Sequence, residues 1–198
     1  MRILLALSLM LNLTSAGVAS RWAFRRMVAR RVPIYAELAA ERFSGTPGGS
    51  VVFAGDSHIG SAPLLDMLTP YRQWGIGGQA IADIATWLPG MLNVDVQRLV
   101  LSAGTNDVIE GTTAHEVVRR YKALLDALPD IPTTILGIPP VDGHEAVALT
   151  VSDGLRDLAV ARGADFIALP RAGLGDGIHL SHDDYMAVAE RLREQVDM

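Results

Sequence analysis

From residue 50 onward, short apolar runs alternate with segments whose apolar residues recur at helical spacing. The predicted strands are Ser50–Ala54, Tyr71–Trp74, Arg98–Ser102, Thr133–Ile138 and Asp165–Leu169. The predicted helices are Pro63–Leu68, Ile81–Leu88, Thr113–Leu128, Ala146–Arg162 and Asp183–Val196, and Pro89-Gly90 predicts the end of the second. Continuously apolar strands are typical of a parallel sheet that helices cover on both faces. The alternation therefore predicts an α/β fold.

The first 31 residues differ from the rest in charge. Residues 1–31 contain six arginines and no acid, whereas the remainder carries 11 basic residues against 22 acidic ones. Ile3–Leu13 is almost wholly apolar, and Ser15–Ser20 is small and weakly polar. These features favour an N-terminal apolar helix that acts as an uncleaved membrane anchor with a basic flank. A cleaved signal peptide and a helix packed against the core are the alternatives.

The chain accordingly divides into three parts. Residues 1–31 are predicted as an anchor or signal segment, residues 32–49 as a connecting helix and loop, and residues 50–198 as the folded domain. An anchor would hold the protein at a membrane, and its arginines favour the cytoplasmic side by the positive-inside rule. A signal-like start would instead export the domain, which would be periplasmic or secreted if the segment is cleaved.

Two features of composition exclude classes of partner and of chemistry. The formal net charge of -5 argues against nucleic acid as a partner. The chain has no cysteine, which excludes disulfides, thiolate metal sites and a cysteine nucleophile.

Polar and glycine-rich clusters follow three of the predicted strands, and a fourth cluster lies near the C-terminus. They are Gly55–His58, Gly75–Gly78, Gly104–Asp107 and Asp176–His179. Each is weak evidence alone, because glycine-rich turns and helix-capping Asn or Asp are common after strands. Ligands of parallel sheets bind at the carboxyl ends of the strands, so we expect the clusters to face one site.

Together the clusters contain the parts of an acyl-transfer site. Ser57 is the candidate nucleophile at a strand-to-helix turn, and a serine hydroxyl needs a neighbouring base. His179 is the candidate base, and Asp176 is the candidate acid that binds the other imidazole nitrogen. The candidate oxyanion donors are the backbone N–H groups of Ser57 and Gly78 and the side-chain amide of Asn106.

The four clusters, in this order, resemble the motif blocks of the SGNH (GDSL-type) esterase and lipase family over about residues 50–195. The resemblance implies a three-layer α/β/α flavodoxin-like sandwich around a five-stranded parallel sheet. It implies that the name-giving residues are Ser57, Gly78, Asn106 and His179, with Asp176 as the triad acid. The activity it implies is hydrolysis of lipid-derived, short-acyl or O-acetyl esters, with no cofactor and no metal.

Several positions depart from the family's pattern. Gln73 stands where the second block often begins with Asn, and Gln79-Ala80 follows Gly78 where the family often has Asp-Thr. Tyr185 also lacks the glycine that often precedes it. We expect these positions not to touch the proposed catalytic atoms, and they leave the acyl group and the alcohol of the substrate open.

Neighbouring residues offer alternative roles. Asp56 is an alternative acid, although its place beside Ser57 favours hydrogen bonds to the local backbone. His58 is an alternative base, although the side chains of adjacent residues usually diverge. Asp107 is expected to anchor its loop, and His182 to lie in a loop or at a helix start.

Two rival functions use the same residues. A metallohydrolase would draw its ligands from Asp56, His58, Asp107, Asp176, His179 and His182. A membrane-associated structural or assembly subunit would keep the hydrolase fold without turnover. The complete set of nucleophile, base, acid and oxyanion donors favours a serine esterase over both.

Overall fold

The computed structural model describes residues 37, 49–62, 71–92, 96–171, 173 and 176–196 of the chain. The N-terminal apolar helix expected in residues 1–31, almost all of residues 32–49 and the helix expected over Pro63–Leu68 lie outside these residues. No helix in the described ranges is long and apolar enough to cross a membrane.

A five-stranded parallel sheet forms the centre of the fold, as the apolar runs predict. Its strands are β1 (Ser50–Gly55), β2 (Tyr71–Gly75), β3 (Val96–Ser102), β4 (Thr133–Leu136) and β5 (Asp165–Ile167), in the order β2-β1-β3-β4-β5. Gly55 of β1 pairs with Gly75 of β2 and with Ser102 of β3. These three strands therefore end level with one another, and the clusters that follow them start from the same edge.

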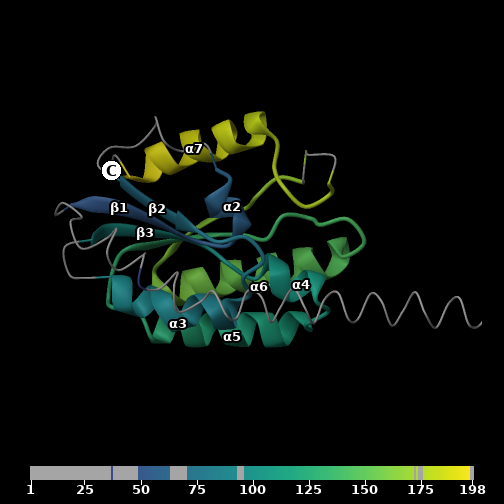
Figure 1. The fold of residues 1–198 in the computed structure, drawn as a ribbon, viewed down its shortest axis with the longest axis horizontal. Helices are drawn as coiled ribbons and strands as arrows, with labels where there is room; N and C mark the ends of the chain where they lie inside the picture. The colour runs from purple at the N-terminus through teal and green to yellow at the C-terminus, as the bar shows by residue number, and fades with distance from the viewer. Residues whose placement is uncertain are drawn as a thin grey trace, which may run out of the picture.

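Helices lie on both faces of the sheet (Figure 1). They are α2 (Ser57–Gly60), α3 (Ile81–Met91), α4 (Thr105–Ile109), α5 (Ala114–Asp126), α6 (Glu145–Arg162) and α7 (His182–Val196). In Figure 1, α7 lies above the sheet, and α3, α5 and α6 lie below it. The result is a three-layer α/β/α arrangement.

Alternating residues of β1 show how both faces are buried. Val51 and Phe53 pack in the cluster that contains the apolar side of α7. Val52 and Ala54 point the other way and pack with α3, α5 and α6. Successive side chains of a strand face opposite sides, so a strand covered on both sides carries apolar residues in both directions.

The end of α3 differs from the prediction. The helix continues through Pro89 and Gly90 to Met91, so the boundary predicted from Pro89-Gly90 is wrong. Proline removes one backbone donor, and close to a helix end this loss is small. Met91 is 7% exposed and packs with Trp87 and Leu88, and this burial favours the additional residues of helix.

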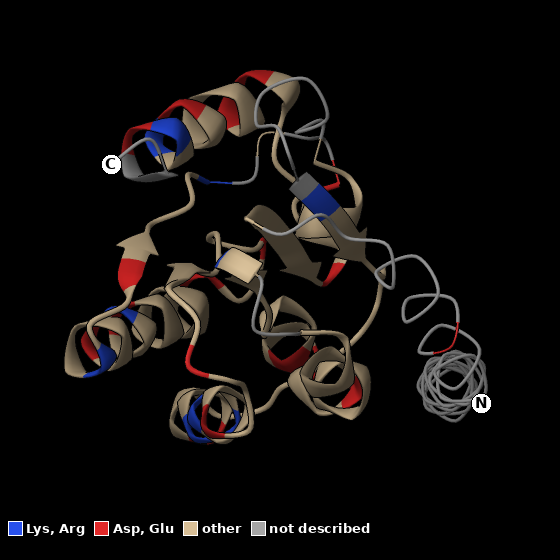
Figure 2. Ribbon diagram, turned by 90° about the vertical axis from the view of Figure 1, so that its left-hand side faces the viewer, with Lys and Arg blue, Asp and Glu red and all other residues tan. Residues whose placement is uncertain are grey.

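Charged residues of both signs are interspersed along the outer helices (Figure 2). On α5, Glu116 pairs with Arg119 and Arg120, and Lys122 pairs with Asp126. Exposed pairs of this kind contribute little to stability, because water and salt screen them. Their role is to keep the outer surface of this helix polar while its other side packs on the sheet.

Candidate active site

The turn after β1 presents Ser57. Gly55 has a φ of 153°, and a Cβ there would lie 1.9 Å from the carbonyl oxygen of Ser102, so only glycine fits. The backbone N–H of Asp56 donates to that same oxygen at 3.0 Å. The chain then turns directly into α2, of which Ser57 is the half-buried first residue. Gln73 of β2 secures the far end of this turn by donating to the carbonyl of Ala62 at 3.0 Å.

Ser57, His179 and Asp176 form one hydrogen-bonded row, although 122 positions separate the serine from the histidine. His179 Nε2 lies 2.9 Å from Ser57 Oγ, and His179 Nδ1 lies 2.6 Å from Asp176 Oδ2. The turn before α7 thus places its histidine over the turn that follows β1.

Donors surround the carboxylate of Asp176. Its Oδ1 accepts from the backbone N–H groups of Ile178 and His179, both at 2.9 Å. The side-chain bond from His179 lowers the pKa of Asp176 most, and the two backbone donors lower it further. An ionised carboxylate can only accept, so Nδ1 of the neutral imidazole carries the hydrogen. Nε2 is then free to accept the hydroxyl hydrogen of Ser57.

The two other predicted oxyanion donors approach the same turn. Gly78 has a φ of 77°, and a Cβ added at Gly77 would lie 3.8 Å from Cβ of Ser57, so the turn after β2 lies against the serine. Asn106, the second residue of α4, donates from Nδ2 to the carbonyl oxygen of Gln79 at 2.8 Å. The Asn106 amide therefore lies beside the residue that follows Gly78.

Asp107 fastens α4 to its neighbours. Its side chain is fully buried, and Oδ2 accepts from the backbone N–H of Ile81 at 2.8 Å. Oδ1 accepts from Arg120 of α5 at 2.8 Å. Asp107 is thus an anchor, as the sequence suggests, and it holds the starts of α3 and α4 together.

Comparisons with known proteins bear on this arrangement. Neither a protein-family model nor a curated protein sequence matches the chain. Solved structures match at low identity. A protein named for platelet activating factor, from Streptococcus pneumonia, has a TM-score of 0.74 and 18% identity over 90% of this chain and 99% of that one. A lipolytic protein of the G-D-S-L family from Veillonella parvula DSM 2008 has a TM-score of 0.63 and 14% identity over 73% of this chain and 96% of that one. Est24, a carbohydrate acetylesterase from Sinorhizobium meliloti, has a TM-score of 0.65 and 17% identity over 75% of this chain and 98% of that one.

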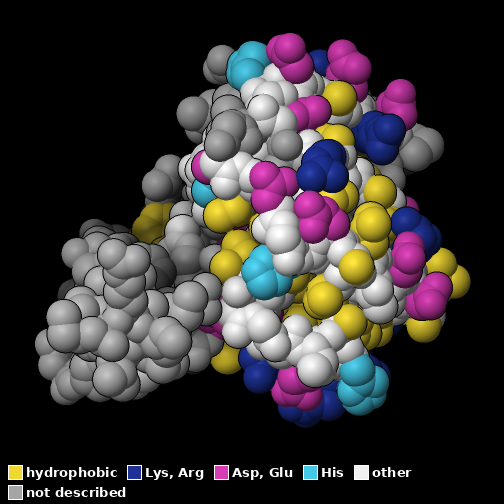
Figure 3. Space-filling model, turned by 90° about the vertical axis from the view of Figure 1, so that its right-hand side faces the viewer, with side chains coloured by type: hydrophobic (Ala, Val, Ile, Leu, Met, Phe, Trp, Pro, Cys, Tyr) yellow, Lys and Arg dark blue, Asp and Glu magenta, His cyan; other side chains and the backbone are white. Residues whose placement is uncertain are grey.

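The fold is that of the GDSL-type esterases. This agrees with the fold that the four motif clusters imply. Figure 3 looks onto the carboxyl edge of the sheet in this GDSL-type fold, where histidine, acidic and basic side chains lie among apolar ones.

Asp56 and His58 lie close to Ser57 but do not form a second row. Asp56 Oδ1 accepts from the backbone N–H of His58 at 3.0 Å and caps α2. Neither ring nitrogen of His58 has a hydrogen-bond partner among the residues that the structure describes. The His58 ring centre lies 5.5 Å from that of His179. The geometry thus favours the turn-shaping role of Asp56 and gives no support to His58 as the base of Ser57.

The candidate ligands of the metallohydrolase alternative do not converge on one site in the described part of the chain. Asp107 binds Ile81 and Arg120, while Asp56 binds the backbone of its own turn. His182 is the exposed first residue of α7. In the part of the chain that the structure describes, no three His, Asp or Glu side chains converge on one point.

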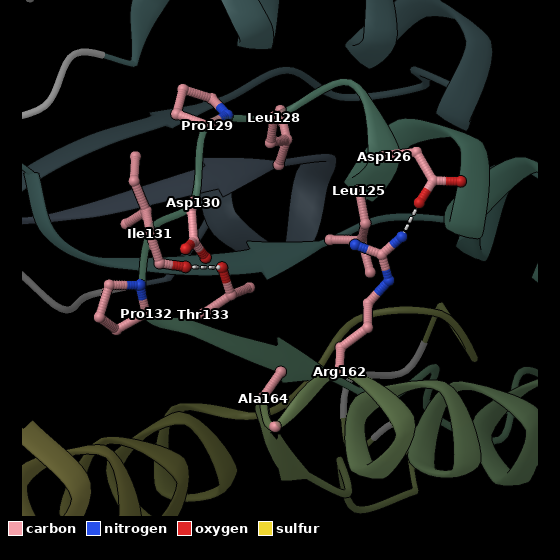
Figure 4. A pocket seen from close by; sticks show the side chains of 11 residues that line it. Leu125, Asp126, Leu128, Pro129, Asp130, Ile131, Pro132, Thr133, Arg162 and Ala164 are labelled. Atoms are coloured by element: carbon pink, nitrogen blue, oxygen red, sulfur yellow. Dashed lines mark hydrogen bonds and ion pairs between the residues drawn. The ribbon is translucent and has the colours of Figure 1, made fainter.

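A cavity of about 570 Å³ lies at the opposite edge of the sheet, where β4 begins (Figure 4). It is lined by the end of α5, the following loop and the end of α6. Arg162 and Asp126 form an ion pair there, and the Thr133 hydroxyl donates to the carbonyl of Ile131 at 2.8 Å. None of the predicted catalytic or oxyanion residues lines this cavity.

Three residues that hold the site have no role in the site predicted from the sequence: Gln79, Trp87 and Arg120. The expectation that Gln79 touches no proposed catalytic atom is wrong, because its main-chain oxygen accepts from Asn106 Nδ2. Trp87 Nε1 donates to Gln79 Oε1 at 2.8 Å, and Arg120 donates to Asp107. Gln79 precedes α3, whose N-cap is Ala80, so helical spacing alone does not predict its contact with Trp87. That pair depends on how the turn after β2 packs on α3, and the pairing of Arg120 with Asp107 depends on how α4 and α5 pack.

Proposed function

We propose that this chain is a serine hydrolase of carboxylic esters. The observation that carries the proposal is the continuous row from Asp176 through His179 to Ser57 at the carboxyl edge of a GDSL-type fold. Such a row makes a serine hydroxyl nucleophilic, because the base removes the proton while the carboxylate stabilises the resulting imidazolium.

The first half of the reaction forms an acyl-enzyme. Ser57 Oγ attacks the ester carbonyl carbon, and its proton passes to His179 Nε2. The carbonyl oxygen becomes an oxyanion, which accepts from the backbone N–H groups of Ser57 and Gly78 and from the Asn106 amide. The tetrahedral intermediate then collapses, the bond to the alcohol oxygen breaks, and His179 returns the proton to the leaving alcohol.

The second half regenerates the enzyme. Water takes the place of the alcohol and loses a proton to His179 Nε2 as its oxygen attacks the acyl carbon. The same donors bind the second oxyanion. Collapse breaks the bond to Ser57 Oγ, which recovers its proton from His179, and the carboxylic acid leaves. Each step uses groups of this chain and water alone.

The substrate class is best defined by a panel of esters. We propose lipid-derived, short-acyl or O-acetyl esters, because the fold neighbours include a lipolytic protein and a carbohydrate acetylesterase. The panel would vary acyl length and alcohol, with Ser57→Ala as the control for every substrate. A serine-directed phosphonate should label the wild type and not the variant. Equal hydrolysis by both proteins would disprove a serine mechanism at this site.

The proposal includes membrane attachment through residues 1–31. Its basis is the apolar run Ile3–Leu13 and the arginines after it, which attract anionic lipid. Attachment would place Ser57 near lipid-derived and cell-envelope esters. The test is to fractionate the intact protein and to determine its first residue. Recovery in the soluble fraction with a new N-terminus near Ser20 would instead establish a cleaved signal peptide.

A further inference from the structure

Gln79 is held through its main-chain oxygen and its side-chain oxygen. It follows Gly78 directly and is 0% exposed. Its main-chain oxygen accepts from Asn106 Nδ2 at 2.8 Å, and its side-chain oxygen accepts from Trp87 Nε1 at 2.8 Å. One residue therefore links a proposed oxyanion donor to an indole ring in the core.

The bond to Gln79 fixes the direction of the Asn106 amide. A planar NH₂ group carries two hydrogens, and when one is bound the direction of the other is set. The second hydrogen of Asn106 is the one that a developing oxyanion would accept. The position of the Gln79 carbonyl therefore sets the orientation of the Asn106 amide. A small shift of that carbonyl would point the second N–H away from the oxyanion.

Trp87 is the fixed end of this link. It lies on α3, is 2% exposed and packs with Ile84 and Leu88. An indole has one donor, so its bond to Gln79 Oε1 has a single geometry. A second hydrogen bond lies beside the one between Asn106 and Gln79, because Asp107 accepts from the backbone N–H of Ile81. The start of α3 is thus joined to α4 at two adjacent points.

We infer that Gln79 and Trp87 are positioning residues for the Asn106 oxyanion donor. The inference rests on the proposed function, since an oxyanion forms only if Ser57 attacks an ester. Neither residue touches the substrate, and each acts through the main-chain oxygen of Gln79. A merely structural role would instead lower stability and leave the rate of the chemical step unchanged.

The experiment compares two variants that each remove one buried ring donor. Trp87→Phe removes the indole N–H and keeps a ring. Tyr121→Phe is the matched control, because the buried Tyr121 hydroxyl donates to the carbonyl of Leu101 at 3.2 Å in the same core cluster. Both variants should lower the melting temperature. Trp87→Phe should also lower kcat about tenfold with KM nearly unchanged, a fraction of the cost of removing a whole oxyanion donor, whereas Tyr121→Phe should leave both constants near the wild-type values.

A double-mutant cycle shows whether Trp87 acts through Asn106. In an Asn106→Ala background, Trp87→Phe should change kcat by less than about twofold, because the donor it positions is already gone. Affinity for a boronic acid that forms a tetrahedral adduct with Ser57 should fall in parallel with kcat. A tenfold loss that repeats in the Asn106→Ala background would overturn the inference.

The remaining outcomes are also decisive. If Trp87→Phe does not fold, Gln79→Met removes the same bond from its other end and should give the same non-additive loss. A loss confined to KM, or an equal loss in Tyr121→Phe, would reduce Gln79 and Trp87 to structural residues. A wild type no more active than Ser57→Ala would overturn the proposed function instead, so the two failures are distinguishable.

Discussion

Two acid–histidine pairs flank Ser57, and they differ in solvation and in the atoms they join. Asp56 and His58 are 0% and 1% exposed, and the carboxylate binds the backbone N–H of the histidine. The side chains of Asp176 and His179 are 47% and 25% exposed, and this carboxylate binds both the ring and the backbone of its histidine. Only the second pair reaches the serine hydroxyl.

The difference shows why the more buried pair is the poorer candidate for catalysis. Burial raises the pKa of Asp56 and lowers the pKa of His58, so both groups are driven toward their neutral forms. The pKa of Asp176 is lowered by the hydrogen bonds it accepts from His179 and Ile178. A relay that must carry an imidazolium in its transition state needs an ionised partner. Hydrogen-bond donors and contact with water keep Asp176 ionised, whereas burial opposes the ionisation of Asp56.

The largest expected effect separates the two histidines. His179→Ala should lower kcat by roughly 10⁶-fold, because the base and the serine act as a unit. His58→Leu should keep kcat within about tenfold, because the His58 ring makes no bond to Ser57, and it should not lower stability, since an apolar side chain removes a buried polar group. The measurement is kcat on the best ester of the panel, with circular dichroism to show that both variants fold.

The opposite ranking would reverse the assignment. If folded His58→Leu lost most activity while His179→Ala kept it, the buried histidine would be the base of Ser57. The hydrogen-bonded row in the structure would then be incidental.

The two aspartates should differ by a smaller factor. Asp176→Asn should lower kcat by about 10⁴-fold, because an amide cannot hold the imidazole in the required tautomer or stabilise its charge. Asp56→Asn keeps an oxygen that can accept from the N–H of His58, so α2 keeps its cap and kcat should change far less. A greater loss of kcat in Asp56→Asn than in Asp176→Asn, with both proteins folded, would move the triad acid to the buried pair.

Asn106 and Asp107, on α4 after β3, allow a second comparison of two neighbouring polar residues. Asn106→Ala should cost about 2.7–4 kcal/mol of transition-state stabilisation, seen in kcat more than in KM. Asp107→Asn should act mainly on the free energy of unfolding, because its carboxylate binds Ile81 and Arg120 and not the substrate. Kinetics and urea unfolding of both variants would test this, and a pure rise in KM for Asn106→Ala would make Asn106 a substrate-binding residue instead.

The sequence predicts the sheet well because strand periodicity and turn chemistry are local. It also predicts that Ser57 and Asn106 share one edge, because parallel strands end together. The end of α3 at Met91 depends on burial that the local signal of Pro89 cannot report. The link between Gln79 and Asn106 likewise arises only when the turn after β2 packs against α4. The features that the sequence does not predict are contacts between elements, and these contacts orient the proposed oxyanion donor Asn106.

The smallest effect expected from the two pairs lies in the pH dependence of stability, where they should have opposite signs. The pKa of Asp176 is lowered in the folded protein, so its contribution is present above the unfolded value near 3.8 and is lost as the pH falls through the folded value. The pKa of Asp56 is raised, so its pH-dependent penalty is absent below pH 3.8, and stability is lost as the pH rises through the folded value. Asp176→Asn should therefore be less stable than the wild type at neutral pH, with a deficit that shrinks toward pH 3. Asp56→Asn should improve relative to the wild type as the pH rises from 4 to 7, because its amide is uncharged throughout. Urea unfolding of the three proteins from pH 3 to pH 7 measures both slopes. Slopes of the same sign would show that the difference in burial does not set the ionisation of the two carboxylates.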